Sequence, residues 1–354
     1  MNKKRDKKKF KRKNINISNV ELTNIDHFTD DEVSEEKRAE KKSIEKGRLS
    51  SKRDLKLARG RILEVRSNYM CLVKIGEKEL TCTLGGRFKQ VNFETKSIVI
   101  AGDYVNVDVS SDLRIEEIID RTNSLSRFSD NDFQTEIIIA SNVDQVIITS
   151  SYKDPQLNLG LIDRYICAAR INNITPVICV NKIDLAESLD LVKQAGSFYE
   201  KLGFSVIYTS TKSGDGIEDL RELLKDKDSV FSGHSGAGKS SLLNMLQPGF
   251  KLRTAKISEY HKKGVHTTTR SRLLEWDFGG YLVDTPGIKT FGLHRNDKEK
   301  LKDIFPGMST LARGCKFFNC THSHEMKCGV KKAVEEGIYP LARYESYLRI
   351  LDSL

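Results

Sequence analysis

The sequence contains Gly233-His234-Ser235-Gly236-Ala237-Gly238-Lys239-Ser240, which fits the pattern G-x-x-x-x-G-K-[ST]. A short strand-like segment at 229–232 precedes these residues, and a segment with helical spacing at 239–246 follows them. This strand–loop–helix context predicts a phosphate-binding loop, in which backbone N–H groups surround phosphates at a helix N-terminus. We expect Lys239 to reach the β- and γ-phosphates and to contribute to catalysis, and Ser240 to bind Mg²⁺.

A second motif, Asn181-Lys182-Ile183-Asp184, follows a buried apolar segment at 176–180. An aspartate at such a turn can accept hydrogen bonds from the N1–H and the exocyclic amine of guanine, which adenine does not offer. The asparagine would brace the loop and bond the base. The motif therefore predicts GTP rather than ATP as the ligand. The alternative is a P-loop ATPase or kinase, for which Asp184→Asn would leave the nucleotide preference unchanged, whereas a GTPase would lose its guanine selectivity.

A third motif, Asp284-Thr285-Pro286-Gly287, ends a later strand-like segment. Asp284 is expected to reach Mg²⁺ through water, and the Gly287 N–H to sense the γ-phosphate. The guanine motif thus precedes the phosphate loop along the chain, which reverses the order of ordinary GTPases. This order predicts a circularly permuted GTPase.

Two further segments complete the predicted nucleotide site. The polar segment 264–269 is expected to supply a threonine to Mg²⁺, with Thr268 as the first choice and Thr267 as the alternative. Ser210 lies where a backbone amide commonly supports the guanine O6, although an ordinary polar strand end would read the same way. The predicted GTP-binding residues are Asn181, Lys182, Asp184, Ser210, Gly233, His234, Ser235, Gly236, Ala237, Gly238, Lys239, Ser240, Ser241 and Gly287.

The group that would orient the attacking water is not obvious in this chain. Ile288 follows Gly287, where Ras-like enzymes place a glutamine. Either a partner completes the site or another side chain such as His266 substitutes. His266 can equally be a surface histidine, so both interpretations stay open.

Three cysteines and a histidine cluster near the C-terminus as Cys315-x4-Cys320-x-His322-x5-Cys328. Three thiolates and an imidazole suit a tetrahedral structural zinc, and four protein ligands leave no open position for catalysis. His324 is a competing imidazole. The seven cysteines of the chain are therefore expected to be reduced rather than paired in disulfides.

The net charge of +10 is concentrated at the N-terminus, where nine of the first 13 residues are basic and one is acidic. Such a run repels itself and is expected to be disordered, with a polyphosphate such as RNA as its partner or with a solubilising role as the alternative. No apolar run approaches the roughly 20 residues of a membrane span, and no signal peptide is visible. We expect a cytoplasmic protein.

Short apolar alternations at 61–65, 69–73 and 104–109, broken by glycines, predict a small antiparallel β-barrel. From 142 to 293 strand-like and helix-like segments alternate, as in a nucleotide-binding α/β sheet. Tyr69 and Phe93 in the barrel region, together with Phe88, could stack on bases, but packing in the barrel core is the favoured interpretation.

These motifs together resemble the bacterial small-subunit-dependent GTPases known as the RsgA (YjeQ/YloQ) family. The resemblance extends over about residues 58–354. The segments that carry it are 139–146, 181–184, 233–243, 266–269, 284–292 and 315–328.

The resemblance implies a multidomain protein. The expected order is a basic arm at 1–57, an OB-fold β-barrel at 58–127, a circularly permuted α/β P-loop GTPase domain at 128–296 and an α-helical zinc-binding domain at 297–354. It also places one zinc ion per subunit on Cys315, Cys320, His322 and Cys328, and the family's proposed catalytic histidine on His266.

The resemblance further implies a late small-subunit assembly factor. Such a protein would bind the 30S subunit with its 16S rRNA near the decoding region, and the subunit would stimulate hydrolysis of GTP to GDP and phosphate. A monomer is the default expectation. The alternative function is a guanine-nucleotide-dependent RNA-binding scaffold in which hydrolysis is incidental.

Overall fold

The computed structural model describes residues 55–67, 70–89, 98–110, 112–128, 136–250, 271–284 and 293–354. Residues 55–354 form one compact unit. The predicted arm lies almost wholly outside the described residues, as do Tyr69 and Phe93. None of the helices in the described ranges has the length and apolar character that a membrane span requires.

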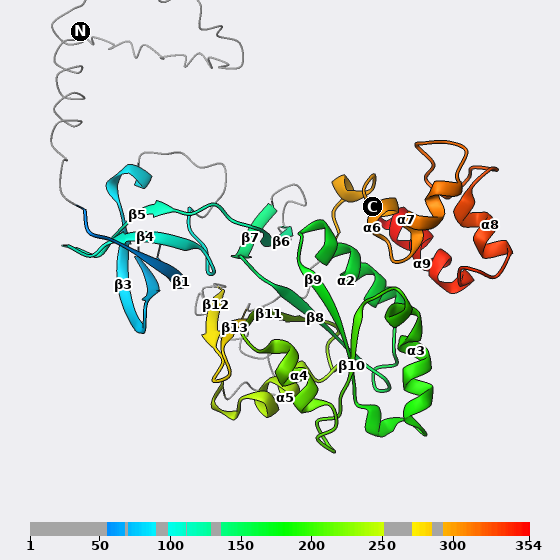
Figure 1. The fold of residues 1–354 in the computed structure, drawn as a ribbon, viewed down its shortest axis with the longest axis horizontal. Helices are drawn as coiled ribbons and strands as arrows, with labels where there is room; N and C mark the ends of the chain where they lie inside the picture. Colours follow the sequence, from blue (N-terminus) through cyan, green and yellow to red (C-terminus); the bar gives the residue numbers. More distant parts are fainter. Residues whose placement is uncertain are drawn as a thin grey trace, which may run out of the picture. The chain divides into compact units, whose positions relative to one another are not determined.

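Five strands form the predicted N-terminal barrel, which is confirmed, although it is not wholly antiparallel because β3 and β5 run parallel (Figure 1). They pair in the order β1-β2-β3-β5-β4, and β1 also pairs with β4, which closes the ring. Inward side chains such as Ile62, Val73 and Ile115 fill its core, and Phe88 packs against that core. The bounds are β1 Leu57–Ser67, β2 Met70–Ile75, β3 Lys78–Leu84, β4 Tyr104–Asp108 and β5 Arg114–Ile118, with a 3₁₀ turn η1 at Gly86–Lys89.

The central α/β domain is built on six strands in the order β10-β9-β8-β11-β13-β12. Neighbouring strands run parallel except β12 and β13, which form an antiparallel pair. The strands are β8 Gln145–Ser151, β9 Thr175–Asn181, β10 Ser205–Tyr208, β11 Lys227–Ser232, β12 Arg272–Glu275 and β13 Gly280–Asp284. The helices are α2 Leu159–Ile171, α3 Leu189–Lys201, α4 Ile217–Leu224 and α5 Lys239–Leu246, with 3₁₀ turns η2 Ile183–Leu185 and η3 Pro248–Phe250.

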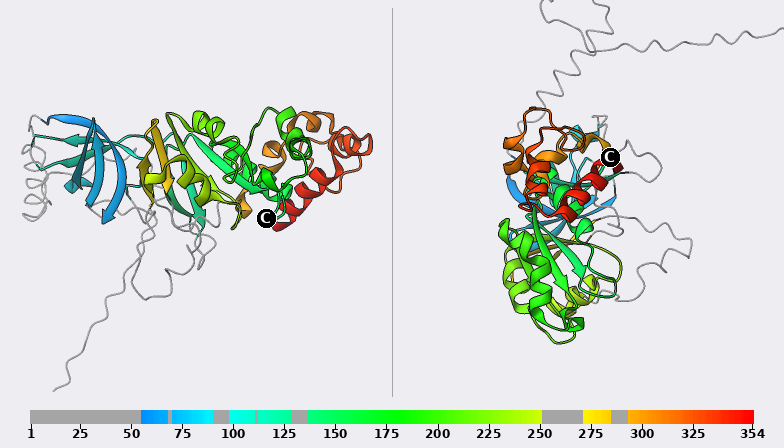
Figure 2. Two further views of the ribbon diagram at one scale, coloured as in Figure 1. Left: turned by 90° about the horizontal axis from the view of Figure 1, so that it is seen from below. Right: turned by 90° about the vertical axis from the view of Figure 1, so that its right-hand side faces the viewer.

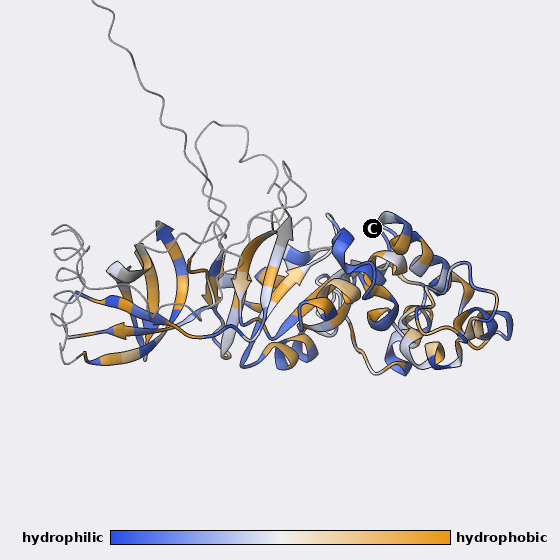
Figure 3. Ribbon diagram, turned by 90° about the horizontal axis from the view of Figure 1, so that it is seen from above, coloured by the Kyte–Doolittle hydropathy of each residue, from blue (hydrophilic) through white to orange (hydrophobic). Residues whose placement is uncertain are grey.

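The two faces of this sheet are buried under different helices. Successive side chains of a strand point to opposite faces, so Val146 and Ile148 of β8 join the core beneath α2 and α3, while Ile147 joins the core beneath α4 and α5. Helices α2 and α3 lie on one side of the strands and α4 and α5 on the other (Figure 1). The central strands are coloured hydrophobic, whereas the helices carry both colours, as amphipathic helices do (Figure 3).

A short hairpin links the barrel to the α/β domain. It consists of β6 Ser124–Phe128 and β7 Glu136–Ser141, and it spans the predicted boundary at 127/128. Strand β1 of the barrel also pairs with β12, so the barrel strands and the α/β strands belong to one continuous sheet (Figure 2). The domain boundaries therefore stay a prediction.

The C-terminal region is helical and shares a hydrophobic core with α2 and α3. Tyr347 and Ile350 of α9 and Val330 of α8 belong to the same buried cluster as Ile162 of α2. The helices are α6 Leu301–Ile304, α7 Met308–Leu311, α8 Gly329–Glu335 and α9 Leu341–Ser353, with 3₁₀ turns η5 Arg295–Asp297 and η6 Ala312–Gly314.

Candidate nucleotide site and metal centre

Three predicted motifs meet at one edge of the α/β sheet. Asn181 ends β9, the phosphate loop follows β11 at Ser232, and Asp284 ends β13. Because β9, β8, β11 and β13 are parallel, their carboxyl ends share this edge, where α/β proteins bind ligands. Segments far apart along the chain are thus brought together.

The phosphate loop depends on two glycines whose backbone is left-handed, Gly233 with φ 140° and Gly238 with φ 92°. A Cβ at Gly233 would lie 2.0 Å from the Thr149 carbonyl oxygen, and one at Gly238 would lie 2.2 Å from the Asn181 side-chain nitrogen. No larger residue can occupy these positions without displacing the loop. Helix α5 begins directly after Gly238, so Ser240 and Ser241 lie in its first turn.

Lys239 folds back over the phosphate loop. Its Nζ donates to the carbonyl oxygens of Gly233 at 2.7 Å and His234 at 2.9 Å. Burial lowers the pKa of the Lys239 ammonium, since the charged form loses solvation. A phosphate anion at this loop would therefore gain a cation that is already oriented and partly desolvated.

Asn181 joins the guanine motif to the phosphate loop. Its side chain is fully buried, and its Nδ2 donates to the Ala237 carbonyl oxygen at 2.9 Å. Its Oδ1 accepts from the Thr209 hydroxyl at 3.1 Å. One amide thus holds three segments in register, and the role of Thr209 in this bond was not apparent from the sequence.

Asp184 is held by the following polar strand end. The Ser210 hydroxyl donates to Asp184 Oδ1 at 2.6 Å, and it accepts from the backbone amides of Lys212 and Ser213, each at 3.2 Å. The Ile183 amide also donates to the Thr209 carbonyl oxygen at 3.2 Å. The carboxylate that would read guanine is therefore fixed before any ligand binds, by the side chain of a residue for which the sequence predicted only a backbone role.

Lys182 makes a contact that the sequence did not predict. Its backbone is left-handed, with φ 60°, and its Nζ donates to the carbonyl oxygen of Asp154. The next residue, Pro155, lies beside the phosphate loop, with its Cδ 3.5 Å from where a Cβ of Gly236 would be. The segment after β8 thus lies between the guanine motif and the phosphate loop. In the sequence, the feature that could have indicated this position was a proline soon after the end of a strand.

Asp284 is partly buried at the end of β13. Burial raises the pKa of its carboxyl group, and the opposing Arg272 partly offsets this rise. The other residues predicted at this end of the site, His266, Thr268 and Gly287, lie outside the described residues.

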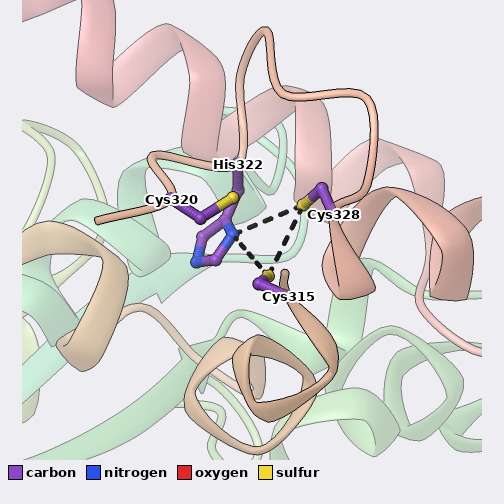
Figure 4. A group of neighbouring side chains, drawn as sticks. All are labelled: Cys315, Cys320, His322 and Cys328. Carbon is purple, nitrogen blue, oxygen red and sulfur yellow. Dashed lines mark hydrogen bonds between the residues drawn. The ribbon is translucent and has the colours of Figure 1, made fainter. Parts of the chain in front are cut away.

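The predicted metal ligands are brought together near the C-terminus. The ligand atoms of Cys315, Cys320, His322 and Cys328 all lie within 4.8 Å of one another (Figure 4). Cys315 Sγ is 3.9 Å from Cys328 Sγ, and His322 Nδ1 is 3.5 and 3.4 Å from these two sulfurs. A tetrahedral zinc would require about 3.8 Å between sulfurs and about 3.5 Å between sulfur and nitrogen. The four side chains therefore fit a metal ion of this kind.

The surroundings of the cluster act on its sulfurs in both directions. Burial raises the pKa of Cys320 to about 12 and also raises that of Cys328, whereas backbone amides stabilise negative charge on two sulfurs. The Gly329 amide donates to Cys315 Sγ at 3.2 Å, and the Lys331 amide to Cys328 Sγ at 3.5 Å. Burial lowers the pKa of His322, which keeps the ring neutral, as a ligand must be. His324 does not join the cluster, because its side chain is 82% exposed.

Glu325 braces the metal loop, which the sequence did not indicate. It accepts from the amides of Thr321 at 2.6 Å and Ser323 at 3.1 Å. Although burial opposes ionisation, the hydrogen bonds from the Thr321 amide and hydroxyl help to lower the pKa of Glu325 to about 2. The sequence feature that could have indicated this role is that Glu325 is the single acidic residue between Cys315 and Cys328.

The fold and this site define a P-loop GTPase with permuted motif order. Comparisons with known proteins agree. The sequence profile of the RsgA GTPase family matches residues 118–294. A Flavobacterium psychrophilum protein named small ribosomal subunit biogenesis GTPase RsgA is 37% identical over 280 residues, which cover 77% of this chain and 86% of the relative.

Two solved structures are similar to most of this chain. YjeQ from Thermotoga maritima has a TM-score of 0.69 at 35% identity and covers 84% of this chain and 98% of its own. YloQ, described as a circularly permuted GTPase, has a TM-score of 0.64 at 30% identity and covers 86% of this chain and 96% of its own. The chain therefore belongs to the RsgA GTPase family and is a GTP hydrolase.

Proposed function

We propose that this GTP hydrolase acts in the assembly of the small ribosomal subunit, and that the 30S subunit stimulates its hydrolysis. The name of the Flavobacterium psychrophilum relative supports this role, and barrels of this five-strand type are recurrent binders of nucleic acid. The 16S rRNA is the partner that the basic composition favours. A cytoplasmic location follows from that role.

The observation that carries the nucleotide site is the bonding of Asn181. Because this amide ties the guanine motif to the phosphate loop, a nucleotide could span both with its base near Asp184 and its phosphates near Lys239. We assign GTP binding to the residues predicted above on this basis. Asp184 would accept from the guanine N1–H and amine, and Lys239 would neutralise phosphate charge.

Magnesium would be held by Ser240 and Thr268 directly and by Asp284 through water. When bound, Mg²⁺ would neutralise charge on the β- and γ-phosphate oxygens. His266 and the Gly287 amide would act on the γ-phosphate side. The roles proposed for Thr268, His266 and Gly287 are inferred from the sequence alone.

The metal in the cluster of Cys315, Cys320, His322 and Cys328 would be zinc, one ion per chain. The donor set and the distances suit zinc, and four protein ligands make the ion structural. The ion would hold the loop between Cys315 and Cys328 against α8 and α9.

A genetic test separates this function from that of a scaffold with incidental hydrolysis. A strain that lacks the gene would be complemented with the wild-type chain or with Lys239→Ala. We expect the wild type to restore small-subunit maturation and the variant to fail. Full restoration by a variant shown to be inactive in hydrolysis would favour the scaffold.

A further inference from the structure

The barrel contacts the hairpin formed by β12 and β13. Strand β1 pairs with β12 where Glu64 faces Arg272, and the hairpin lies beside the barrel strands in the left view of Figure 2. Along the chain the hairpin connects the two segments predicted to respond to the γ-phosphate, 264–269 and 285–287. The barrel therefore holds the element that joins them.

Arg61 of β1 makes a buried part of this contact, with a side chain 11% exposed. It forms an ion pair with Asp228 at the start of β11, whose side chain is 9% exposed. Its guanidinium also lies 4.9 Å from the ring centroid of Tyr104 in the barrel and 5.2 Å from that of Tyr281 in β13. A cation between two rings favours one relative position of the strands that carry them.

Lys74 of β2 makes the second contact. Its Nζ lies 2.5 and 2.6 Å from the two carboxylate oxygens of Glu275, at the end of β12. The same ammonium lies 5.9 Å from the Tyr281 ring centroid. Arg61 and Lys74 thus approach Tyr281 together, and we name these two residues the barrel clamp.

The barrel clamp is connected to the nucleotide site through one strand. Tyr281 lies in β13, which ends at Asp284. Opposite Asp284 stands Arg272, the residue that pairs with Glu64 of the barrel. A shift of the hairpin relative to the barrel would therefore move the carboxylate proposed to reach Mg²⁺.

We propose that Arg61 and Lys74 are positioning residues for GTP hydrolysis, which set Asp284 through the β12–β13 hairpin. Through these two residues, a partner that binds the barrel would change the position of Asp284. The inference rests on the proposed function only for the identity of that partner, the RNA of the small subunit.

The Lys74–Glu275 pair allows a charge-swap test on the full chain. We expect Lys74→Glu and Glu275→Lys each to speed hydrogen exchange of the β12–β13 amides about tenfold, and the double variant to restore it. Arg61→Met should act in the same direction. Arg59→Met is the matched control, because Arg59 stacks on the same Tyr104 ring at 4.8 Å but is not the partner of Asp228.

The second readout is the Mg²⁺ concentration that gives half-maximal GTP turnover without ribosomes. A displaced Asp284 should raise it about fivefold in Lys74→Glu, with recovery in the double variant and little change in the KM for GTP. Trp276, the only tryptophan in the sequence, follows Glu275 and reports on the hairpin by its fluorescence.

Unchanged exchange and unchanged Mg²⁺ dependence in both Lys74→Glu and Arg61→Met would overturn the proposal. So would equal defects in the single and double charge variants, because they would indicate general damage. A wild-type chain that 30S subunits do not stimulate would refute the proposed function but leave both readouts intact. If Arg61→Met fails to fold, the charge swap at Lys74 and Glu275, which are more exposed, still tests the proposal.

Discussion

Asn181 and Asp184 show what a single residue does in this site. Asn181 is bonded on both sides, to Ala237 and Thr209, and Asp184 is bonded to Ser210. The identity of the two motif residues could be predicted because few residue types can make these contacts. Their partners could not, since the Thr209 hydroxyl reaches Asn181 only after β9 and β10 have paired.

Asp184→Asn should change the nucleotide preference. The amide cannot accept from both guanine donors, so GTP affinity should fall by about 3 kcal/mol, roughly 100-fold, from the loss of two charge-assisted bonds. The new NH₂ group can instead donate to the 2-oxo group of xanthine. Titration with fluorescent GDP and XDP analogues checks this, and unchanged GDP affinity would contradict the role of Asp184.

At the scale of elements, continuous apolar runs predicted the strands β8 and β9, because a strand buried on both faces does not alternate with polar residues. Strand β8 is buried along its whole length and β9 from Val177 to Asn181. Strand β5, Arg114–Ile118, was not predicted because three of its five residues are charged, and it is recognised as a strand through its pairing with β3 and β4. The ion pair of Asp163 in α2 with Arg343 in α9, at 2.6 Å, joins residues 180 positions apart. No local sequence pattern predicts an ion pair between residues so far apart along the chain.

The Asp163–Arg343 pair leads to a prediction about stability. Arg343→Met leaves the Asp163 carboxylate buried without its cation, which should cost about 3–5 kcal/mol in the free energy of unfolding. Chemical denaturation measures it. The double variant Asp163→Asn/Arg343→Met should lose less free energy of unfolding than Arg343→Met, because no buried charge is left unpaired. A loss well below about 3 kcal/mol in Arg343→Met would contradict this role of the pair.

The same variant should depend on pH in a defined direction. Burial already raises the pKa of Asp163, with Arg343 opposing the rise, so removal of Arg343 should raise it further. A carboxyl group whose pKa is higher in the folded state binds more protons there than in the unfolded state. The free energy of unfolding therefore falls as pH rises above the unfolded-state pKa, which is about 3.9 for aspartate. The stability deficit of Arg343→Met should therefore shrink as pH falls from 7 toward 4, and a deficit independent of pH would contradict this.

The cluster of Cys315, Cys320, His322 and Cys328 leads to a prediction about zinc content. Cys320→Ser should weaken zinc binding by more than about 100-fold and increase hydrogen exchange across residues 315–328. His324→Ala is the matched control, because this exposed imidazole lies outside the cluster. Elemental analysis of the two purified proteins measures the difference, and a full zinc content in Cys320→Ser would refute the ligand assignment.

At the scale of the whole molecule, the permuted order determines what adjoins each side of the site. Only 27 residues, 288–314, separate Gly287 from Cys315, and such a short connection is one route by which nucleotide state could set the position of the C-terminal helices. The described contacts favour another route. The C-terminal helices share a core with α2 and α3 and are fixed there by the Asp163–Arg343 pair, whereas the hairpin that carries Asp284 is held by the barrel.

Small-subunit-dependent turnover tests the proposed function most directly. Steady-state GTP hydrolysis by the full chain would be measured alone, with purified 30S subunits and with purified 50S subunits, with Lys239→Ala as the inactive control. We predict at least about tenfold stimulation by 30S subunits and none by 50S subunits, since a partner that completes a GTPase site has effects of this size or larger. Turnover that is the same with and without 30S subunits would contradict it.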